Sequence, residues 1–369
     1  MKALATKNWK RLAVSGALAV TLAAGSVAGL AGCSSQDNST SSNSNLEKTE
    51  FNLGYLNSTA HLFAFVAQEE GYFADEGLNI NLTQFSSSSE LESGLSNGKL
   101  DVAFISTVPT FTFASQGSDI SIFGGAMTNG HGYVIKSDYT KGKSSWDISV
   151  LKDRNVASVK NSIQDAELQQ LLDQAGIKIG DDKGEVHIKY FDSQKDAYAA
   201  LKNASIDAAS VYSPYASLAE SEGYSIVYRC SDEKLLKDQP CCRQIAPTDA
   251  LNSDPNSYTA FERAIIKAYE FSQTNHDKTI EDVKKYIDID EDAIETEVYG
   301  GYGTSYPDPD TKASSELKKA IVKLGYTSDF DETEHYNTKI YESALESLTK
   351  EDSDNKILKE LNEHFEEAN

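Results

Sequence analysis

The stretch "NGKLDVAFISTVP", residues 97–109, carries the pattern that decides the fold. Its centre, residues 102–105, is a short apolar run, which predicts a buried strand. Ser106 and Thr107 follow at once, and Pro109 stands where the first turn of a helix would lie, a position that suits proline. A buried strand that leads through a capped loop into a helix is the repeating unit of α/β domains with a largely parallel sheet.

The same unit recurs on both sides of this stretch. We expect further strands at residues 51–56, 79–85, 155–159, 186–191, 206–211 and 224–229, and helices at 61–70, 86–97, 161–174, 194–203 and 213–222. After Pro247 the pattern becomes helical, at residues 258–274, 280–286, 291–298, 314–324, 337–348 and 356–367. The pattern therefore predicts two α/β lobes and a helical C-terminal tail that packs on the first lobe.

The amino-terminal segment has the features of a secretory signal. Four basic and no acidic residues precede an apolar stretch at 12–30, which ends in Leu-Ala-Gly-Cys at 30–33. This ending resembles the bacterial lipobox, which implies a signal peptide over residues 1–32 and a diacylated Cys33. The polar residues 33–49 then predict a flexible tether to the membrane. A transmembrane anchor is the alternative interpretation.

The net charge limits the classes of partner that the protein can bind. The chain has 34 Lys and Arg against 57 Asp and Glu, a formal net charge of −23. A surface this acidic disfavours binding to nucleic acid and to anionic lipid, so we expect no nucleic-acid partner. After the leader, no stretch reaches the roughly 18 uninterrupted apolar residues that a spanning helix needs.

Four stretches together resemble one protein family. They are residues 71–78 (GYFADEGL), 95–103 (LSNGKLDVA), 151–159 (LKDRNVASV) and 200–214 (ALKNASIDAASVYSP). Their order and spacing are similar to those of the bacterial ABC-importer substrate-binding proteins of the nitrate/sulfonate/taurine and thiamine-precursor group. Ala204 stands where that family usually has glycine, and the likeness fades beyond about residue 288.

The resemblance implies a periplasmic-binding-protein-like type II fold. Two α/β lobes would be joined by crossing segments near residues 134–141 and 241–247. Lobe 1 would comprise residues 50–138 and 245–369, and lobe 2 residues 139–244. Closure of such lobes on a ligand is a recognised way to signal occupancy.

The resemblance also implies a function. The protein would be a monomeric, lipid-anchored binding protein on the extracytoplasmic face of the cell membrane. It would deliver a small, anionic or zwitterionic organic solute to an ABC permease and ATPase, without a cofactor and without enzymatic activity. A sensory or adhesion lipoprotein is one alternative. Another is an enzyme, because the fold that the resemblance implies is also similar to that of sulfinate desulfinases and thiamine-pyrimidine synthases.

Polar loops that follow the predicted strands are the candidate ligand site. Ligands of open α/β sheets bind beyond the carboxyl ends of strands, where helix N-termini offer free N–H groups to an anion. Arg243 could add a bidentate contact from the return strand. Ordinary N-capping explains the same Ser, Thr and Asn residues without a ligand. The candidates are Asn57, Ser58, His61, Ser86, Ser87, Ser106, Thr107, Thr128, His131, Ser162, Gln164, Tyr212, Ser213, Cys241, Cys242 and Arg243.

Cys230, Cys241 and Cys242 allow several interpretations. Outside the cytoplasm Cys230 could pair with either of the other two, or all three could be buried thiols. They could also contact the ligand. Catalysis needs a base and an orienting partner, which the sequence does not specify, and a structural zinc site needs four ligands, so we predict no metal site. Strand alternation would point Cys241 and Arg243 to one side and Cys242 to the other.

Overall fold

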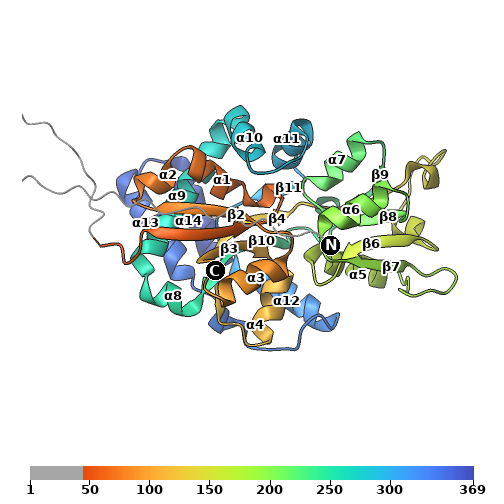
Figure 1. Cartoon of the computed structure of the whole chain (residues 1–369), viewed down its shortest axis with the longest axis horizontal. Coiled ribbons are helices and arrows are strands. Elements are labelled where there is room, and N and C mark those ends of the chain that lie inside the picture. Colours follow the sequence, from red (N-terminus) through yellow and green to blue (C-terminus); the bar gives the residue numbers. More distant parts are fainter. Residues whose placement is uncertain (1–44) are drawn as a thin grey trace, which may run out of the picture. The chain divides into compact units, whose positions relative to one another are not determined.

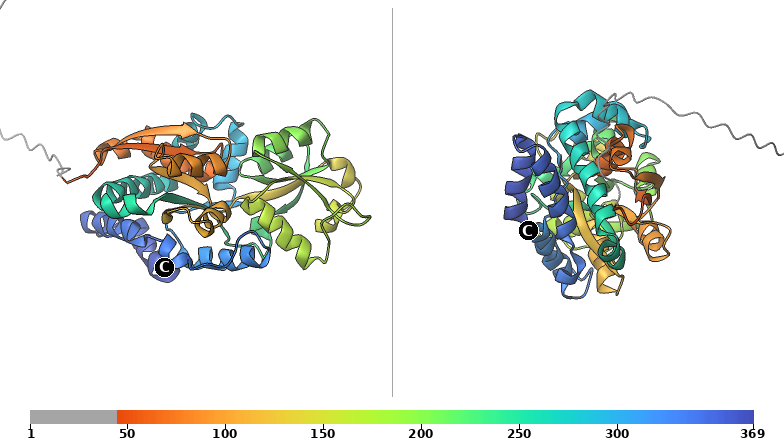
Figure 2. Two further views of the ribbon diagram at one scale, coloured as in Figure 1. Left: turned by 60° about the horizontal axis from the view of Figure 1, so that its bottom comes forward. Right: turned by 90° about the vertical axis from the view of Figure 1, so that its left-hand side faces the viewer.

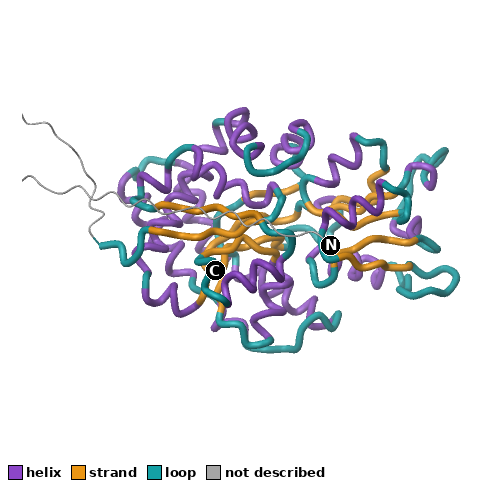
Figure 3. Tube along the Cα trace, in the orientation of Figure 1, coloured by secondary structure: helices purple, strands orange, loops and turns teal. Residues whose placement is uncertain are grey.

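The structure, a computed structural model, describes residues 45–369 and contains two β-sheets (Figure 1). The first sheet has the order β11-β4-β10-β3-β1-β2, and the second has the order β7-β6-β8-β5-β9. Figure 3 shows helices around both sets of strands. The strands are β1 (Glu50–Tyr55), β2 (Asn79–Gln84), β3 (Val102–Ser106), β4 (Ile120–Asn129), β5 (His131–Ile135), β6 (Asn155–Val159), β7 (His187–Phe191), β8 (Ala208–Tyr212), β9 (Ser225–Arg229), β10 (Pro240–Pro247) and β11 (Gly303–Ser305).

Each sheet combines three parallel strands at one edge with further strands that pair antiparallel. In the first sheet β1 pairs in parallel with β2 and β3, and in the second β6 pairs in parallel with β7 and β8. The late strand β10 enters the first sheet antiparallel to both β3 and β4, while β5 pairs antiparallel with β8 and β9. The two α/β units that the sequence predicts are thus confirmed.

The chain changes sheets earlier than predicted at both crossings. It leaves the first sheet at Gly130, which has a φ of 84° and lies between β4 and β5. Such a φ is readily adopted by glycine, so the chain can turn there without strain. The chain returns before Pro240. The predicted crossings at 134–141 and 241–247 are therefore misplaced: the boundary at 138/139 leaves β5 in the wrong lobe, and the boundary at 244/245 falls inside β10.

The predicted helices are present with ends that differ by a few residues. Strands β4, β5 and β11 and the short helices α2 and α8 were not predicted. The helices are α1 (Leu62–Glu69), α2 (Tyr72–Asp75), α3 (Ser88–Ser96), α4 (Thr107–Ser115), α5 (Ile163–Gln174), α6 (Gln194–Lys202), α7 (Tyr215–Ser221), α8 (Thr248–Ser253), α9 (Pro255–Thr274), α10 (His276–Lys284), α11 (Glu291–Tyr299), α12 (Thr311–Lys323), α13 (Thr338–Glu351) and α14 (Lys356–Ala368).

The C-terminal helices pack mainly on the first sheet (Figure 2). Helix α9 places Tyr258 and Phe261 against Phe51 of β1, with ring centroids 5.1 and 5.9 Å apart. Phe123 of β4 joins the same aromatic group, and α13 adds the fully buried Tyr341. Large aromatic side chains bury much apolar area, so this cluster fixes the tail to the first sheet. Helix α11 differs, because it packs on α7 beside the second sheet.

The end of the predicted tether belongs to the folded body. Leu46 packs against the core, and Glu47 accepts hydrogen bonds from the backbone N–H and the hydroxyl of Ser257, each at 3.0 Å. The prediction of a flexible tether is therefore wrong for these last residues. The signal peptide, Cys33 and the rest of the tether lie outside the described residues. None of the described helices is both long and apolar enough to cross a membrane.

Candidate functional site

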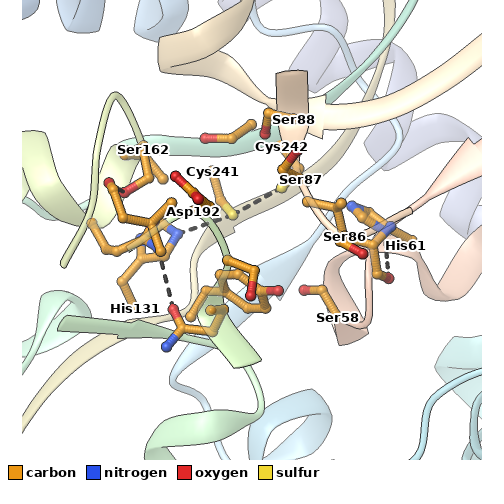
Figure 4. A pocket seen from close by; sticks show the side chains of 18 residues that line it. Ser58, His61, Ser86, Ser87, Ser88, His131, Ser162, Asp192, Cys241 and Cys242 are labelled. Atoms are coloured by element: carbon orange, nitrogen blue, oxygen red, sulfur yellow. Dashed lines mark hydrogen bonds between the residues drawn. The ribbon is translucent and has the colours of Figure 1, made fainter. Parts of the chain in front are cut away.

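A cavity of about 50 Å³ lies where loops of the first sheet face loops of the second (Figure 4). Ser106 ends β3 and Ser162 follows β6, so both lie at carboxyl ends of parallel strands. Such ends are where α/β proteins bind ligands. The lining residues are Leu56, Ser58, His61, Ser86, Ser87, Ser88, Ser106, His131, Val159, Ser162, Ile163, Gln164, Asp192, Ser193, Gln194, Tyr212, Cys241 and Cys242.

Four helices begin at this cavity. Ser87, Ser162 and Ser193 cap α3, α5 and α6, and each side chain accepts a hydrogen bond from the backbone N–H three residues on. Ser106 precedes α4 but makes no such capping bond. The first N–H groups of a helix carry partial positive charge and have no partner within the helix. Together the four helix ends favour a negatively charged group in the cavity.

Three buried polar atoms of the lining have no hydrogen-bond partner within the described residues. They are Nε2 of His61, Oγ of Ser106 and Nε2 of Gln194. Nδ1 of His61 lies 3.1 Å from the backbone nitrogen of Leu56 and 3.3 Å from its carbonyl oxygen, and in the tautomer that accepts the shorter contact the ring proton is on Nε2. All three atoms can therefore donate. Since an unsatisfied buried polar group costs about 1–3 kcal/mol, these donors point to a hydrogen-bond acceptor as ligand.

Both vicinal cysteines line the cavity. Their sulfurs lie 3.1 Å apart, which contradicts the prediction that they point to opposite sides of the strand. The cause is an irregular register between β10 and β4, which shifts between Pro240 and Cys242 and again between Cys242 and Arg243. A bulge of this kind breaks the alternation of side chains and re-aims them.

Cys241 belongs to a buried hydrogen-bonded series that also contains Cys242, His131 and Glu167. Its sulfur lies 3.1 Å from Nε2 of His131, and Nδ1 of the same ring lies 3.1 Å from a carboxylate oxygen of Glu167. Both charged side chains are fully buried. A thiol, a base and an orienting carboxylate are the parts of a nucleophile centre. The sequence does not specify this set, because Glu167 reaches His131 from helix α5, 36 residues farther along the chain.

Charge is stabilised along this series. Burial opposes a charge on His131, but the carboxylate of Glu167 outweighs it and raises the pKa of His131 well above its ordinary value. The hydrogen bond from Cys241 lowers the pKa of Cys242 to about 5, against burial and with help from His61. Burial raises the pKa of Cys241. The contact between the two sulfurs therefore favours the thiolate on Cys242 and the thiol on Cys241.

Cys230 lies behind His131, away from the cavity. All three cysteines of the described part of the chain are free and buried, which fits the interpretation as buried thiols and not the alternative of a disulfide to Cys230. Cys230, His131 and Glu167 have donor atoms within 4.8 Å of one another. Three donors fall short of the four that a structural zinc site needs.

Arg243 does not reach the cavity, contrary to the prediction. Its guanidinium is buried and donates to the backbone carbonyls of Pro309, Met127 and Cys242 at 2.8 to 3.1 Å. Asp310 lies 3.7 Å away. Burial lowers the pKa of Arg243, and the three carbonyl acceptors hold its guanidinium beside the first sheet. Arg243 is therefore a structural residue that joins β10 to the loop before α12.

Most of the predicted ligand residues meet at the cavity. Those that line it are Ser58, His61, Ser86, Ser87, Ser106, His131, Ser162, Gln164, Tyr212, Cys241 and Cys242. The five that do not are Asn57, Thr107, Thr128, Ser213 and Arg243.

Each of the remaining four predicted residues has another contact. Asn57 bonds the Tyr215 hydroxyl, and the hydroxyl of Thr107 donates to the carbonyl of Cys241. Thr128 lies on the Arg243 side of β10. The carbonyl of Ser213 accepts from Ser58, which ties the two sheets together beside the cavity.

The prediction missed seven lining residues: Leu56, Ser88, Val159, Ile163, Asp192, Ser193 and Gln194. Ser193 carried a usable signal, because it precedes a predicted helix just as Ser162 does. Gln194 follows it in the first turn. Applying the same rule to every capped helix start would have found both.

Comparisons with known proteins agree with this fold. The chain is similar to the nitrate-binding protein NrtA from Synechocystis PCC 6803, with a TM-score of 0.70, 16% identity, and 82% of this chain and 90% of that chain covered. It is also similar to the aliphatic sulphonate binding protein SsuA from Escherichia coli, with a TM-score of 0.63, 17% identity, and 76% and 87% covered. The desulfurization enzyme DSZB matches with a TM-score of 0.62, 11% identity, and 82% and 100% covered.

These likenesses establish the fold, which is that of periplasmic-binding-protein-like proteins of type II. A search of curated proteins found no match. The model of the NMT1-like family matches residues 44–287, which is well over half of the chain. This match confirms the resemblance that the four sequence stretches predict, and the chain belongs to the NMT1-like family.

Proposed function

We propose that the protein binds a small, anionic or zwitterionic organic solute outside the cytoplasm and delivers it to an ABC permease with its ATPase. Sulfonate-, taurine- and nitrate-like compounds and thiamine-pyrimidine precursors are the candidates. The observation that carries the proposal is the group of three unpartnered donors, on His61, Ser106 and Gln194, at the cavity where four helices begin.

The composition of the cavity supports a neutral cradle for an anion. Among the described residues that line it there is no lysine or arginine, and serines make up much of the wall. Helix N-termini and neutral donors can hold an anion without a full positive charge, as they do in many phosphate sites. Asp192 adds one carboxylate, which would suit the amine of a zwitterion.

The size of the cavity limits the bound group. One water-sized group needs roughly 10–15 Å³ by this measure, so about 50 Å³ accepts only a few non-hydrogen atoms. A planar oxyanion or the head of a sulfonate has this size. A larger solute would have to extend from the cavity or part the loops that line it.

The lipid anchor is part of the proposal and rests on the sequence alone. Acyl chains on Cys33 would hold the protein at the outer face of the cell membrane, within reach of a permease. We further propose that the protein works as a monomer without a cofactor.

Titration calorimetry with nitrate, taurine and ethanesulfonate tests the binding. Ser106→Ala removes one unpartnered donor, so it should weaken the bound anion by about 1.5–3 kcal/mol, which is roughly ten- to hundredfold in Kd. Ser221→Ala is the matched control, because that hydroxyl is exposed and bonds within α7. Equal affinities in the two variants would refute the site.

Mass spectrometry of solute recovered after long incubation separates a binding protein from an enzyme. We expect the solute to be recovered unchanged. A product of altered mass would favour the enzyme alternative, which the likeness to the fold of a desulfurization enzyme keeps open.

A further inference from the structure

Four side chains form a row along one wall of the cavity: His61, Cys242, Cys241 and His131 (Figure 4). The sulfur of Cys241 lies 3.1 Å from the sulfur of Cys242 on one side and 3.1 Å from Nε2 of His131 on the other. Glu167 lies behind His131 and holds its other ring nitrogen. Helix ends can bind an anion without thiols, so the proposed function assigns no role to Cys241, Cys242 and His131.

The linear arrangement favours a nucleophile over a metal site. Donors of one metal ion must converge on a point about 2.0–2.3 Å from each of them. Within residues 45–369, the group of His, Cys and acidic donors that converges in this way is His131, Glu167 and Cys230, which lies on the far side of the ring. Cys241 and Cys242 are outside it. Cys242, Cys241, His131 and Glu167 each contact the next group, as a proton relay requires.

The charges in the row support the same assignment. His131 contacts Glu167, Cys230 and Cys241, and the hydroxyl of Tyr133 donates to Glu167; the pKa of His131 is raised because the carboxylate outweighs burial. Cys242 has a lowered pKa. A thiolate is the reactive form of cysteine, and a protonated imidazole one thiol away can supply a proton.

We propose that Cys242 is a nucleophile that binds a small aldehyde bearing an anionic group, as a reversible hemithioacetal. The class of ligand rests on the proposed function, because the helix N-termini would hold the anionic group. The unpartnered donors on Ser106, Gln194 and His61, which take an oxygen of the solute in the proposed function, would in this ligand take the carbonyl oxygen, as an oxyanion hole does.

The step balances without a further reactant. The thiolate of Cys242 adds to the carbonyl carbon, a C–S bond forms, and the C=O π pair moves to the oxygen. That oxygen takes the proton of the Cys241 thiol, and Cys241 takes the proton from Nε2 of His131. The charges on the thiolate and the imidazolium cancel, and no atom is oxidised or reduced. Glu167 is a positioning residue that keeps the proton on His131.

Glyoxylate and glycolate test the proposal, because they share a carboxylate and differ in that only glyoxylate has an aldehyde. We expect the wild-type protein to bind glyoxylate at least about tenfold more tightly than glycolate. In Cys242→Ser that ratio should fall to near one, while glycolate affinity stays nearly constant. Ser221→Ala is the control, since this exposed hydroxyl bonds within α7 and lies outside the cavity wall, and it should keep the full ratio.

A second measurement needs no variant. Glyoxylate should abolish the ultraviolet absorbance of the thiolate in the wild-type protein, and glycolate should leave it unchanged.

A third measurement tests the role of Glu167. Glu167→Gln should shift the pH profile of the glyoxylate reaction to lower pH, and Glu167→Asp should restore it, which a purely structural role would not do.

The outcomes separate this proposal from the proposed function. If both acids bind equally and the thiolate absorbance persists, the covalent step is refuted while anion binding stands. If glyoxylate abolishes the thiolate signal but no oxyanion binds in calorimetry, the nucleophile stands and the proposed anion site fails.

Discussion

Replacing Glu297 by glutamine tests the contact that joins the C-terminal tail to the second sheet. Glu297 lies on α11 and is 1% exposed. Its Oε1 accepts from the guanidinium of Arg229 at 2.7 Å and from the backbone N–H and hydroxyl of Ser217 at 3.0 and 2.6 Å. Arg229 ends β9 and stacks on Tyr302 at 3.6 Å. One buried carboxylate therefore connects α11, α7 and β9.

The expected cost follows from the charge left behind. Glutamine keeps the size and one acceptor oxygen but leaves Arg229 buried without its main counter-ion. Removing one partner of a buried ion pair costs about 3–5 kcal/mol. Glu220 also contacts Arg229, at 3.1 Å, but its side chain is 58% exposed and gives only a solvent-screened pair. We therefore expect a loss near the lower end, about 3 kcal/mol.

Urea denaturation followed by circular dichroism measures the free energy of unfolding. Glu295→Gln is the matched control, because it makes the same change on an exposed position of the same helix and should alter stability by less than about 0.5 kcal/mol. A double variant with Arg229→Met should recover part of the loss, because it removes the unpaired charge. If Glu297→Gln unfolds at the same urea concentration as Glu295→Gln, the buried pair does not hold the tail to the second sheet.

Three further predictions concern other parts of the chain. Cys33→Ala should move the protein from the membrane fraction to the soluble fraction, because the acyl chains would be its main attachment; a variant that stays in the membrane would exclude the lipobox. Arg243→Met should lower the free energy of unfolding by about 3 kcal/mol or more and leave Kd for the solute nearly unchanged, since three carbonyls lose a buried donor that does not line the cavity; a calorimetric loss of affinity without a loss of stability would contradict this. Glu167→Gln should lower the free energy of unfolding most near pH 6 and less as the pH rises. The reason is that the raised pKa of His131 stabilises the fold below its unfolded pKa of about 6.5, and this contribution disappears as His131 loses its proton. A difference in unfolding free energy that stays constant in urea denaturation at several pH values would contradict a charged pair.

Local patterns predicted most of the helices and the cavity wall. Ser87, Ser162 and Ser193 each stand three residues before an acidic residue in a helix start, and a cap is decided by the few residues around it. The place of these caps in an α/β fold then follows from topology, because carboxyl ends of parallel strands share one edge. Ligand residues that belong to such caps could therefore be predicted without knowing any long-range contact.

Strand β4 could not be predicted in the same way. Gly124 and Gly125 interrupt it, and glycine in a strand usually weakens the prediction. The structure gives their reason: a Cβ on Gly125 would lie 2.0 Å from the carbonyl oxygen of Asp308, and one on Gly124 would meet Glu262 and Gln244. The two glycines allow segments far away in the sequence to approach the strand closely, so no local pattern explains them.

The position of Glu167 in the sequence indicates that it needs a buried partner, but it does not identify that partner. It stands four residues after Ile163 and four before Leu171, both buried, so it lies on the apolar face of α5. A carboxylate on such a face needs a buried partner, because an unpaired buried charge is too costly. The partner is His131, which enters from β5, 36 residues earlier, through a sheet crossing that only the tertiary fold determines. A charged residue inside an apolar stripe therefore identifies a functional candidate, while the identity of its partner depends on strand order.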